Sequence, residues 1–130
     1  RKNGLEQGVI QIFKDSITNN KPIFQYGDGS QIRDYIYIND VLDVVNKIVH
    51  YNGKSNIFNI GTGQGTSLKN LIKIMEHVLE MRAKIIELPV REIDMKFSVV
   101  DISLASLELD WKPVTNLKDG ILKVLNSQNK

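Results

Sequence analysis

The chain has 130 residues, enough for one domain with a buried hydrophobic core. Hydrophobic residues make up 42% and charged residues 25%, as in globular rather than disordered proteins. The net charge of +2 is too small to indicate a nucleic-acid or membrane surface, and no apolar run approaches the about 20 residues of a membrane span, so we expect neither partner. The absence of cysteine excludes disulfides and thiolate metal sites and fits a reducing compartment, and we expect a cytoplasmic location.

The first predicted elements are a helix and two strands. Apolar residues at helical spacing predict a helix over Val9–Ile17, ahead of Pro22. Pro22–Tyr26 is typical of a short strand that ends at a glycine turn. Tyr35–Ile38 is predicted to be a second strand because it combines β-branched and aromatic residues. The chain opens at Arg1 without an initiator methionine, and we expect it to be part of a longer protein.

The middle of the chain predicts a helix, a strand and a loop. Asn39 or Asp40 is predicted to cap a helix whose apolar stripe runs to Val49, with Gly53 as its stop. Asn56–Ile60 is predicted to be a strand, and a glycine-rich loop follows it.

The second half of the chain predicts three helices and one strand. Thr66 or Ser67 is expected to cap a long helix, and a strand follows over Lys84–Leu88. Asp101 is predicted to open a short helix, Trp111 to fill the core, and Asn116 to cap the last helix. The alternation of strands and helices predicts an α/β fold, a small mixed sheet with flanking helices, in a single domain over residues 1–130.

The segment 26–40 carries the first candidate site residue. Gly27 and Gly29 on either side of Asp28 are typical of a turn that uses positive φ. Arg33 comes just before an apolar segment, where an unpaired buried charge is unfavourable, so its guanidinium needs an anion or an acidic partner. A planar set of donors suits a carboxylate or a phosphate, which makes Arg33 a candidate anion-binding residue.

The glycine-rich loop 61–65 lies where a dinucleotide-binding motif would lie, and Glu87 follows at about the distance of its acidic residue. The third glycine, Gly65, comes one residue too early, because Thr66 occupies the motif position. The chain also has too few strands for a complete dinucleotide fold. A tight structural turn is therefore the favoured interpretation, and no cofactor-binding residue is predicted.

The segment Val90–Asp94 follows a strand and Pro89, and α/β folds place ligands at such strand ends. Arg91 and Asp94 can supply a second phosphate contact and an acceptor for a hydroxyl group. A solvated loop with a local Arg–Asp pair is an equally good interpretation. His50 and His77 have no partner at the spacing of a metal site, and we expect both to be surface residues.

Three segments together resemble one family. They are Gly27-Asp28-Gly29-x-Gln31-x-Arg33-Asp34-Tyr35-Ile36-Tyr37-Ile38-x-Asp40-Val41, Phe58-Asn59-Ile60-Gly61-x-Gly63 and Asp101-Ile102-Ser103-x-Ala105-x-x-x-Leu109-x-Trp111-x-Pro113. In this order they are similar to the carboxyl-terminal part of NAD-dependent sugar-nucleotide epimerases and dehydratases, which are extended short-chain dehydrogenases of the UDP-glucose 4-epimerase type. The resemblance covers about Gly8 to Leu122. Asp110 departs from it, since the family usually has glycine before the tryptophan, and this changes a turn only.

The resemblance implies that the chain is the substrate-binding part of such an enzyme. It implies that Arg33 and Arg91 bind the diphosphate of a nucleotide sugar, most simply a UDP-hexose. Asp94 then accepts hydrogen bonds from the ribose hydroxyls. Phe24 and Tyr26 line the base pocket. The amino-terminal half, outside this chain, is implied to bind NAD and to form the homodimer through its helices.

The catalytic Tyr-x-x-x-Lys pair of the family is also implied to lie in that other half. The four tyrosines here, Tyr26, Tyr35, Tyr37 and Tyr51, are followed four residues later by Ser30, Asn39, Val41 and Ser55, never by lysine. We therefore expect no catalytic residue in the chain and no activity from the chain alone. The parent enzyme is implied to oxidise the sugar transiently with NAD and to return the hydride to its other face.

Two alternatives to an epimerase stay open. A nucleotide-sugar 4,6-dehydratase of the same family shares these segments and differs mainly in the other half. A stand-alone nucleotide-binding or interaction module without catalysis belongs to a different class. Such a module should be polar on the face that otherwise contacts the NAD-binding half, whereas Ile23, Ile32 and Ile93 are apolar and unassigned.

Overall fold

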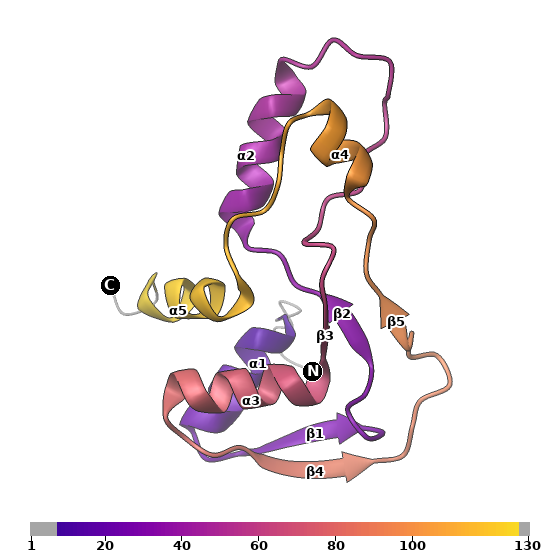
Figure 1. Cartoon of the computed structure of the whole chain (residues 1–130). Coiled ribbons are helices and arrows are strands. Elements are labelled where there is room, and N and C mark those ends of the chain that lie inside the picture. Colours follow the sequence, from indigo (N-terminus) through magenta and orange to yellow (C-terminus); the bar gives the residue numbers. More distant parts are fainter. Residues whose placement is uncertain (1–7, 128–130) are drawn as a thin grey trace, which may run out of the picture.

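The computed structural model describes residues 8–127, which form five helices and five strands (Figure 1). In chain order these are α1 (Val9–Thr18), β1 (Pro22–Tyr26), β2 (Ile32–Asp34), α2 (Ile38–Val49), β3 (Gly65–Ser67), α3 (Leu68–Leu79), β4 (Lys84–Leu88), β5 (Phe97–Ser98), α4 (Ser103–Glu108) and α5 (Leu117–Ser127). In Figure 1, α1, α3 and α5 lie with β1 and β4, α2 and α4 lie together at the other end, and the remaining strands run between. The predicted α/β fold is confirmed.

The strands form two small sheets. β2 lies between β3 and β5, antiparallel to the first and parallel to the second, which is the predicted mixed sheet. β1 and β4 form a separate parallel pair, in which Pro22 is opposite Lys84 and Tyr26 is opposite Leu88. Between β1 and β2 the backbone turns through Gly27 and Gly29, whose φ angles of 70° and 72° suit residues without a Cβ atom.

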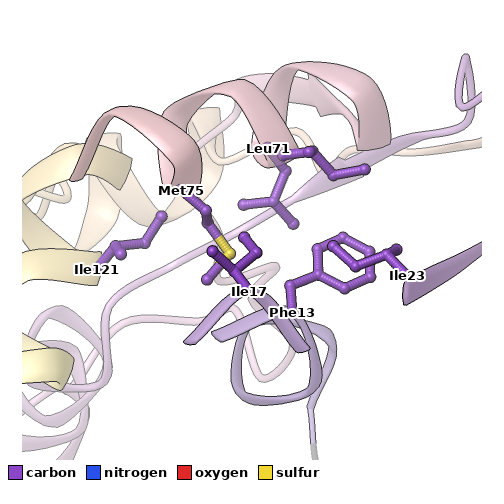
Figure 2. Close-up of a cluster of buried hydrophobic side chains, with 7 residues drawn as sticks. Phe13, Ile17, Ile23, Leu71, Met75 and Ile121 are labelled. Carbon is purple, nitrogen blue, oxygen red and sulfur yellow. The ribbon is translucent and has the colours of Figure 1, made fainter. Parts of the chain in front are cut away.

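One hydrophobic core lies between α1, α3, α5 and β1 (Figure 2). Its buried side chains are Phe13, Ile17, Ile23, Leu71, Ile72, Met75 and Ile121. Ile23 therefore belongs to this core and is not free to contact another domain. The helical spacing of these residues places them on the inner faces of α1 and α3, so burial of apolar area holds both helices against β1.

A second core joins α2 to α4 and to the segment after it. Val44, Ala105, Leu109 and Trp111 are buried together, and Trp111 is the predicted core residue at 2% exposure. The indole N–H of Trp111 donates to the carbonyl oxygen of Asp40 at 3.2 Å. The buried carboxylate of Asp40 accepts hydrogen bonds from the N–H and hydroxyl of Thr115, at 3.0 and 3.2 Å.

Several predicted helix starts are confirmed. The hydroxyl of Ser67 accepts a hydrogen bond from the N–H of Asn70, which caps α3. The side chain of Asn116 accepts from the N–H of Asp119 at the start of α5. The Asp101 carboxylate accepts from the N–H of Ser103, the first residue of α4, although the N-cap of this helix is Ile102. These hydrogen bonds are local, because each side chain bonds a backbone group two or three residues ahead.

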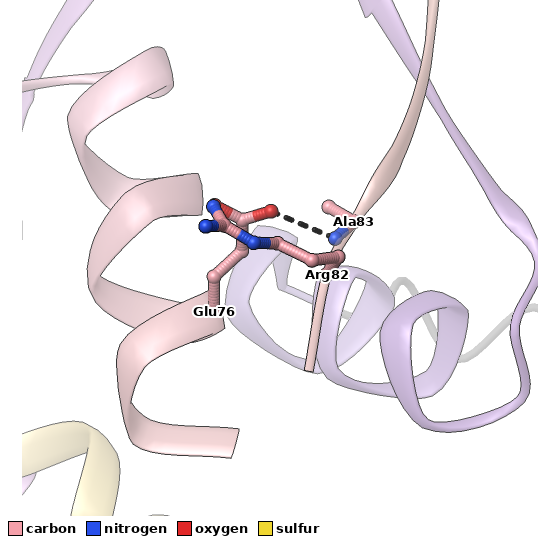
Figure 3. A network of polar contacts seen from close by, with 3 residues as sticks. All are labelled: Glu76, Arg82 and Ala83. Atoms are coloured by element: carbon pink, nitrogen blue, oxygen red, sulfur yellow. Dashed lines mark hydrogen bonds and ion pairs between the residues drawn. The ribbon is translucent and has the colours of Figure 1, made fainter. Parts of the chain in front are cut away.

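Glu76 fixes the connection from α3 to β4 (Figure 3). Its carboxylate accepts a hydrogen bond from the N–H of Ala83 at 2.8 Å and lies 3.5 Å from the guanidinium of Arg82. Arg82 is almost fully exposed, so the ion pair adds little, and the backbone hydrogen bond directs the chain into β4.

The predicted strand at Tyr35–Ile38 is wrong. The strand pairing of β2 ends at Asp34, and Ile38 is already the first residue of α2. The N-cap of α2 is Tyr37, which makes no side-chain cap bond, so the predicted caps Asn39 and Asp40 are wrong as well. Asp40 instead lies buried, and its carboxylate accepts hydrogen bonds from the backbone N–H and the hydroxyl of Thr115.

The predicted strand at Asn56–Ile60 is also not formed. Among residues 8–127 no backbone hydrogen bond reaches residues 56–60, although their composition is typical of a strand. A strand needs a partner, and none of the described strands pairs with this segment. The helix α2 ends at Val49, and therefore before the predicted stop at Gly53.

Candidate functional site

Arg33 lies at the centre of β2, where its side chain has no acidic partner. Its Nη1 donates to the carbonyl oxygen of the adjacent Ile32 at 2.8 Å, and no ion pair to Arg33 is formed within residues 8–127. In register across the sheet, Thr66 on β3 and Ser98 on β5 lie opposite Arg33. Side chains opposite one another share a face of a sheet. The half-buried guanidinium therefore lies between two hydroxyl-bearing residues, with donors left for an anion.

Arg91 and Asp94 lie in the loop that leads from β4 to β5. The exposed Arg91 donates no hydrogen bond within the described residues, and its guanidinium carbon lies 3.2 Å from the centre of the Tyr26 ring. The backbone N–H of Asp94 donates to the carbonyl oxygen of Arg91 at 3.1 Å, which closes a turn. In this part of the chain the half-buried Asp94 carboxylate accepts no hydrogen bond, so it is free to accept one from a ligand.

Phe24 and Tyr26 share the face of β1 that points away from the hydrophobic core. Successive strand residues face opposite sides, so these two lie on one side while Ile23 and Gln25 are buried on the other. Phe24 is 56% exposed and is paired with the 44% exposed Ile86 on β4. An exposed apolar strip of this kind can cover one face of a nucleotide base.

The structure shows direct contact between some of the predicted site residues and places Arg33 on the other sheet. Arg91 contacts Tyr26, and Phe24 lies on the same face of β1. Arg33 belongs to the other sheet, and none of its described hydrogen bonds or ion pairs reaches Arg91 or Asp94. The loop from β4 links the two groups, because the N–H of Ile32 donates to the carbonyl of Lys96 at 2.9 Å before β5 pairs with β2.

Thr66 and Ser98 are neighbours of Arg33 that the sequence analysis missed. Both are distant from Arg33 in the chain, and their types are ordinary surface types. Only strand register could have indicated them, and register depends on which strands pair.

Thr66 also lines a cavity of about 180 Å³ with Tyr35, Thr62, Gln64 and residues 113–117. Burial raises the pKa of Tyr35 above its ordinary value of 10.0, and the nearby positive charge of Arg33 acts in the opposite direction.

The glycine-rich loop is a structural turn, as predicted. The Asp34 carboxylate accepts hydrogen bonds from the backbone N–H groups of Thr62 and Gly63 at 2.9 Å each, and from the Thr62 hydroxyl. A Cβ atom on Gly61 would lie 2.6 Å from that carboxylate and 2.4 Å from Val100, so the glycine permits close packing. The N–H groups that would hold a cofactor phosphate are thus already bonded to an anion, and the loop does not fit NAD.

The histidines form no site in the part of the chain that the structure describes. His50 and His77 are exposed, and His77 contacts Lys118 with 3.1 Å between their nitrogens. Residues 8–127 contain no group of three or more side chains that could hold a metal ion. None of the helices in this range combines the length and the apolar character needed to cross a membrane.

Residues 1–124 match the family model described as GDP-mannose 4,6 dehydratase. The dTDP-4-dehydro-6-deoxyglucose reductase of Escherichia coli is 38% identical over 122 residues, which are 94% of this chain and 39% of that protein. The UDP-glucose 4-epimerase of Mycolicibacterium smegmatis is 31% identical over 120 residues, 92% of this chain and 38% of that protein.

A solved structure of an epimerase is also similar to this chain. The crystal structure of a UDP-glucose 4-epimerase with UDP-glucose from Thermotoga maritima matches with a TM-score of 0.86 and 28% identity, covering 96% of this chain and 41% of that one. The chain therefore spans about two fifths of the length of the proteins that it matches.

Proposed function

Because the chain belongs to the family described as GDP-mannose 4,6 dehydratase, the extended short-chain dehydrogenases that include sugar-nucleotide epimerases, we propose that it is the nucleotide-sugar-binding part of an NAD-dependent epimerase. We further propose a UDP-hexose as the substrate. The Mycolicibacterium relative and the Thermotoga structure, both UDP-glucose 4-epimerases, support this choice. By the same resemblance we expect the full-length protein to be a cytoplasmic homodimer.

The observation that carries the proposal is a set of charged groups with unused hydrogen-bonding capacity. The guanidinium groups of Arg33 and Arg91 have no acidic partner within residues 8–127, and the Asp94 carboxylate accepts no hydrogen bond there. The half-buried, unpaired guanidinium of Arg33 is unfavourable unless a ligand supplies an anion, whereas the exposed guanidinium of Arg91 is solvated and available to a ligand. A nucleoside diphosphate supplies two phosphates for the arginines and ribose hydroxyls for the carboxylate, which matches the donors and acceptors of this set.

The apolar face of β1 supports the base end of the same ligand. Phe24 and Ile86 are opposite one another and exposed, next to the arginine-bearing loop. A base can be covered by this strip while its diphosphate lies toward the arginines. Binding the nucleotide in this way fixes the sugar without contacting its reacting carbon, so that remote binding energy orients the sugar.

The apolar surface of α2 supports the proposal that a further domain covers this chain. Ile38, Leu42, Val45 and Val49 are between 48% and 73% exposed, at spacings that place them along one side of the helix. Residues 56–60 likewise have a strand-like sequence but no backbone partner among the described residues. We propose that the NAD-binding half of the protein covers both. A stand-alone module would leave this surface in water, which disfavours that alternative.

The cofactor is accordingly proposed to bind to the other half. The glycine loop of this chain does not fit NAD, because Asp34 already occupies its N–H groups. NAD supplies the hydride acceptor and donor of the reaction when bound. The residues of this chain hold the nucleotide, orient the sugar and, with the covering domain, keep water from the reacting group.

The test is product analysis with the full-length protein, NAD and UDP-glucose. We expect the C4 epimer of the sugar, identified by NMR, and no net change in NADH. A 4-keto-6-deoxy sugar would instead identify the dehydratase, which the name of the matching family model favours. Failure to bind or convert any nucleotide sugar would contradict both assignments and leave the stand-alone module.

A further inference from the structure

The loop after β4 is held against the end of β1 by Leu88 and Val90, which come just before Arg91. A Cβ atom on Gly27 would lie 3.0 Å from the side chain of Val90, so this turn and the loop are closely packed. The N–H of Gly27 donates to the carbonyl oxygen of Leu88 at 2.9 Å. The Arg91 guanidinium carbon then lies 3.2 Å from the centroid of the Tyr26 ring, which is a direct contact with the ring face.

This contact leaves the hydrogen-bonding edge of Arg91 free. A guanidinium uses its flat face when it lies over an aromatic ring, whereas its five N–H donors point outward in the plane of the group. Binding to the ring and binding to a phosphate are therefore compatible. The same contact covers one face of the Tyr26 ring, and a ring face that carries a guanidinium cannot also carry a base.

We propose that Tyr26 is a positioning residue that holds Arg91 for the diphosphate, and that it does not stack on the base. The inference rests on the proposed function and changes the role that the resemblance implies for Tyr26. Arg91 is exposed and has no acidic partner in the described part of the chain, so without the ring its long side chain would be free to rotate. The base contact on this face is then made by Phe24, two residues earlier, a residue that is 56% exposed.

The experiment compares uridine with UDP as ligands of the full-length protein, by calorimetric titration. Tyr26→Leu removes the aromatic face and keeps an apolar side chain of moderate size. We expect it to weaken UDP binding about two- to fivefold, as expected for loss of a cation–aromatic contact at an exposed site, and to leave uridine binding unchanged. Tyr26→Phe keeps the ring and should restore most of the UDP affinity. Phe24→Leu should weaken uridine and UDP by the same factor.

The double variant of Tyr26→Leu and Arg91→Ala tests whether Tyr26 acts on UDP binding through Arg91. We expect this variant to lose about tenfold or more in UDP affinity, and adding Tyr26→Leu to it should cause no further loss. Arg82→Ala is a matched control, because it removes an exposed arginine at the other end of β4 and should change neither ligand.

Two results would overturn the proposal. The first is an equal loss of uridine and UDP affinity in Tyr26→Leu, which would mean that the ring stacks on the base. The second is a Tyr26→Leu effect that persists in the Arg91→Ala background. If the wild-type protein binds no UDP, the proposed function fails together with this inference. Circular dichroism of each variant verifies folding, and Tyr26→Met, with the same criteria, replaces Tyr26→Leu if that variant does not fold.

Discussion

Asp34 and Thr62 are joined directly, because the carboxylate of Asp34 accepts hydrogen bonds from both the backbone N–H and the hydroxyl of Thr62. The neighbouring N–H of Gly63 donates to the same carboxylate at 2.9 Å. Arg33 precedes Asp34 in β2, and successive strand residues face opposite sides. One short strand thus fixes the glycine loop on one face and presents a guanidinium on the other.

We predict that Asp34→Asn destabilises the protein by about 1–3 kcal/mol. The amide has only one acceptor oxygen, and its NH₂ group would face the N–H donors of the loop. Urea unfolding of the full-length protein measures the change in free energy of unfolding. Thr62→Val removes only the hydroxyl and should have a smaller effect. Equal stability of Asp34→Asn and wild type would show that the loop does not depend on this carboxylate.

Arg33→Ala is expected to weaken nucleotide-sugar binding by about 1.5–3 kcal/mol, the range for a hydrogen bond to a charged group. Arg33→Lys should not restore the affinity, because a point charge cannot reproduce the planar set of donors. Calorimetric titration of the full-length protein with UDP-glucose gives both values. An unchanged affinity in Arg33→Ala, alongside an unchanged Arg82→Ala control, would remove Arg33 from the site.

Asp110→Gly is expected to stabilise the protein by about 0.5–1 kcal/mol. Asp110 follows α4 with a φ of 46°, and this left-handed conformation costs an L-residue about 1–2 kcal/mol. Glycine removes that strain. It also makes the unfolded chain more flexible, which lowers the free energy of unfolding by about 0.4–1 kcal/mol. Thermal and urea unfolding measure the net gain. Asp43→Gly within α2 relieves no strain and should destabilise; a loss of stability in both variants would contradict the prediction.

Stability should depend on Glu108 at acid pH. The hydroxyls of Tyr51 and Ser55 donate to its carboxylate, and these hydrogen bonds hold the pKa of Glu108 below its ordinary value of 4.5. The folded protein therefore binds this proton less readily than the unfolded chain. The contribution of Glu108 to the free energy of unfolding is fully present above pH 4.5. It is lost as the pH falls through the lowered pKa of this carboxyl group.

Glu108→Gln should therefore make the free energy of unfolding less dependent on pH below 4.5. Urea unfolding over a pH series measures the slope in both proteins. The exposed Glu80, which accepts no hydrogen bond within the described residues, provides the control variant Glu80→Gln. If Glu108→Gln keeps the wild-type slope, the hydrogen bonds from Tyr51 and Ser55 do not survive in solution.

The helices were predictable because their signals are local. The apolar spacing of α1 and α3, the Ser67 cap and the Asn116 cap each depend on residues within a few positions of one another. The strands were predictable only where a partner is present. β1 and β4 pair with one another, whereas the strand-like segment 56–60 has no partner in the described chain and stays unpaired.

The candidate site also contains residues that the sequence could predict and residues that it could not. Arg33 was identifiable because a lone arginine before an apolar segment needs an anion, and the structure leaves it without an acidic partner among the described residues. Its neighbours Thr66 and Ser98 were not identifiable, since strand register alone places them opposite it.

The sequence by itself therefore determined the helices, the caps of α3 and α5, the glycine turn and the family, because each depends on residues close together or in a fixed order. Tertiary structure alone decided that Arg91 lies on the ring of Tyr26 and that Asp34 bonds the glycine loop. Both contacts join segments far apart in the chain, and their energies depend on the pairing of strands and loops in space, which local preferences do not specify.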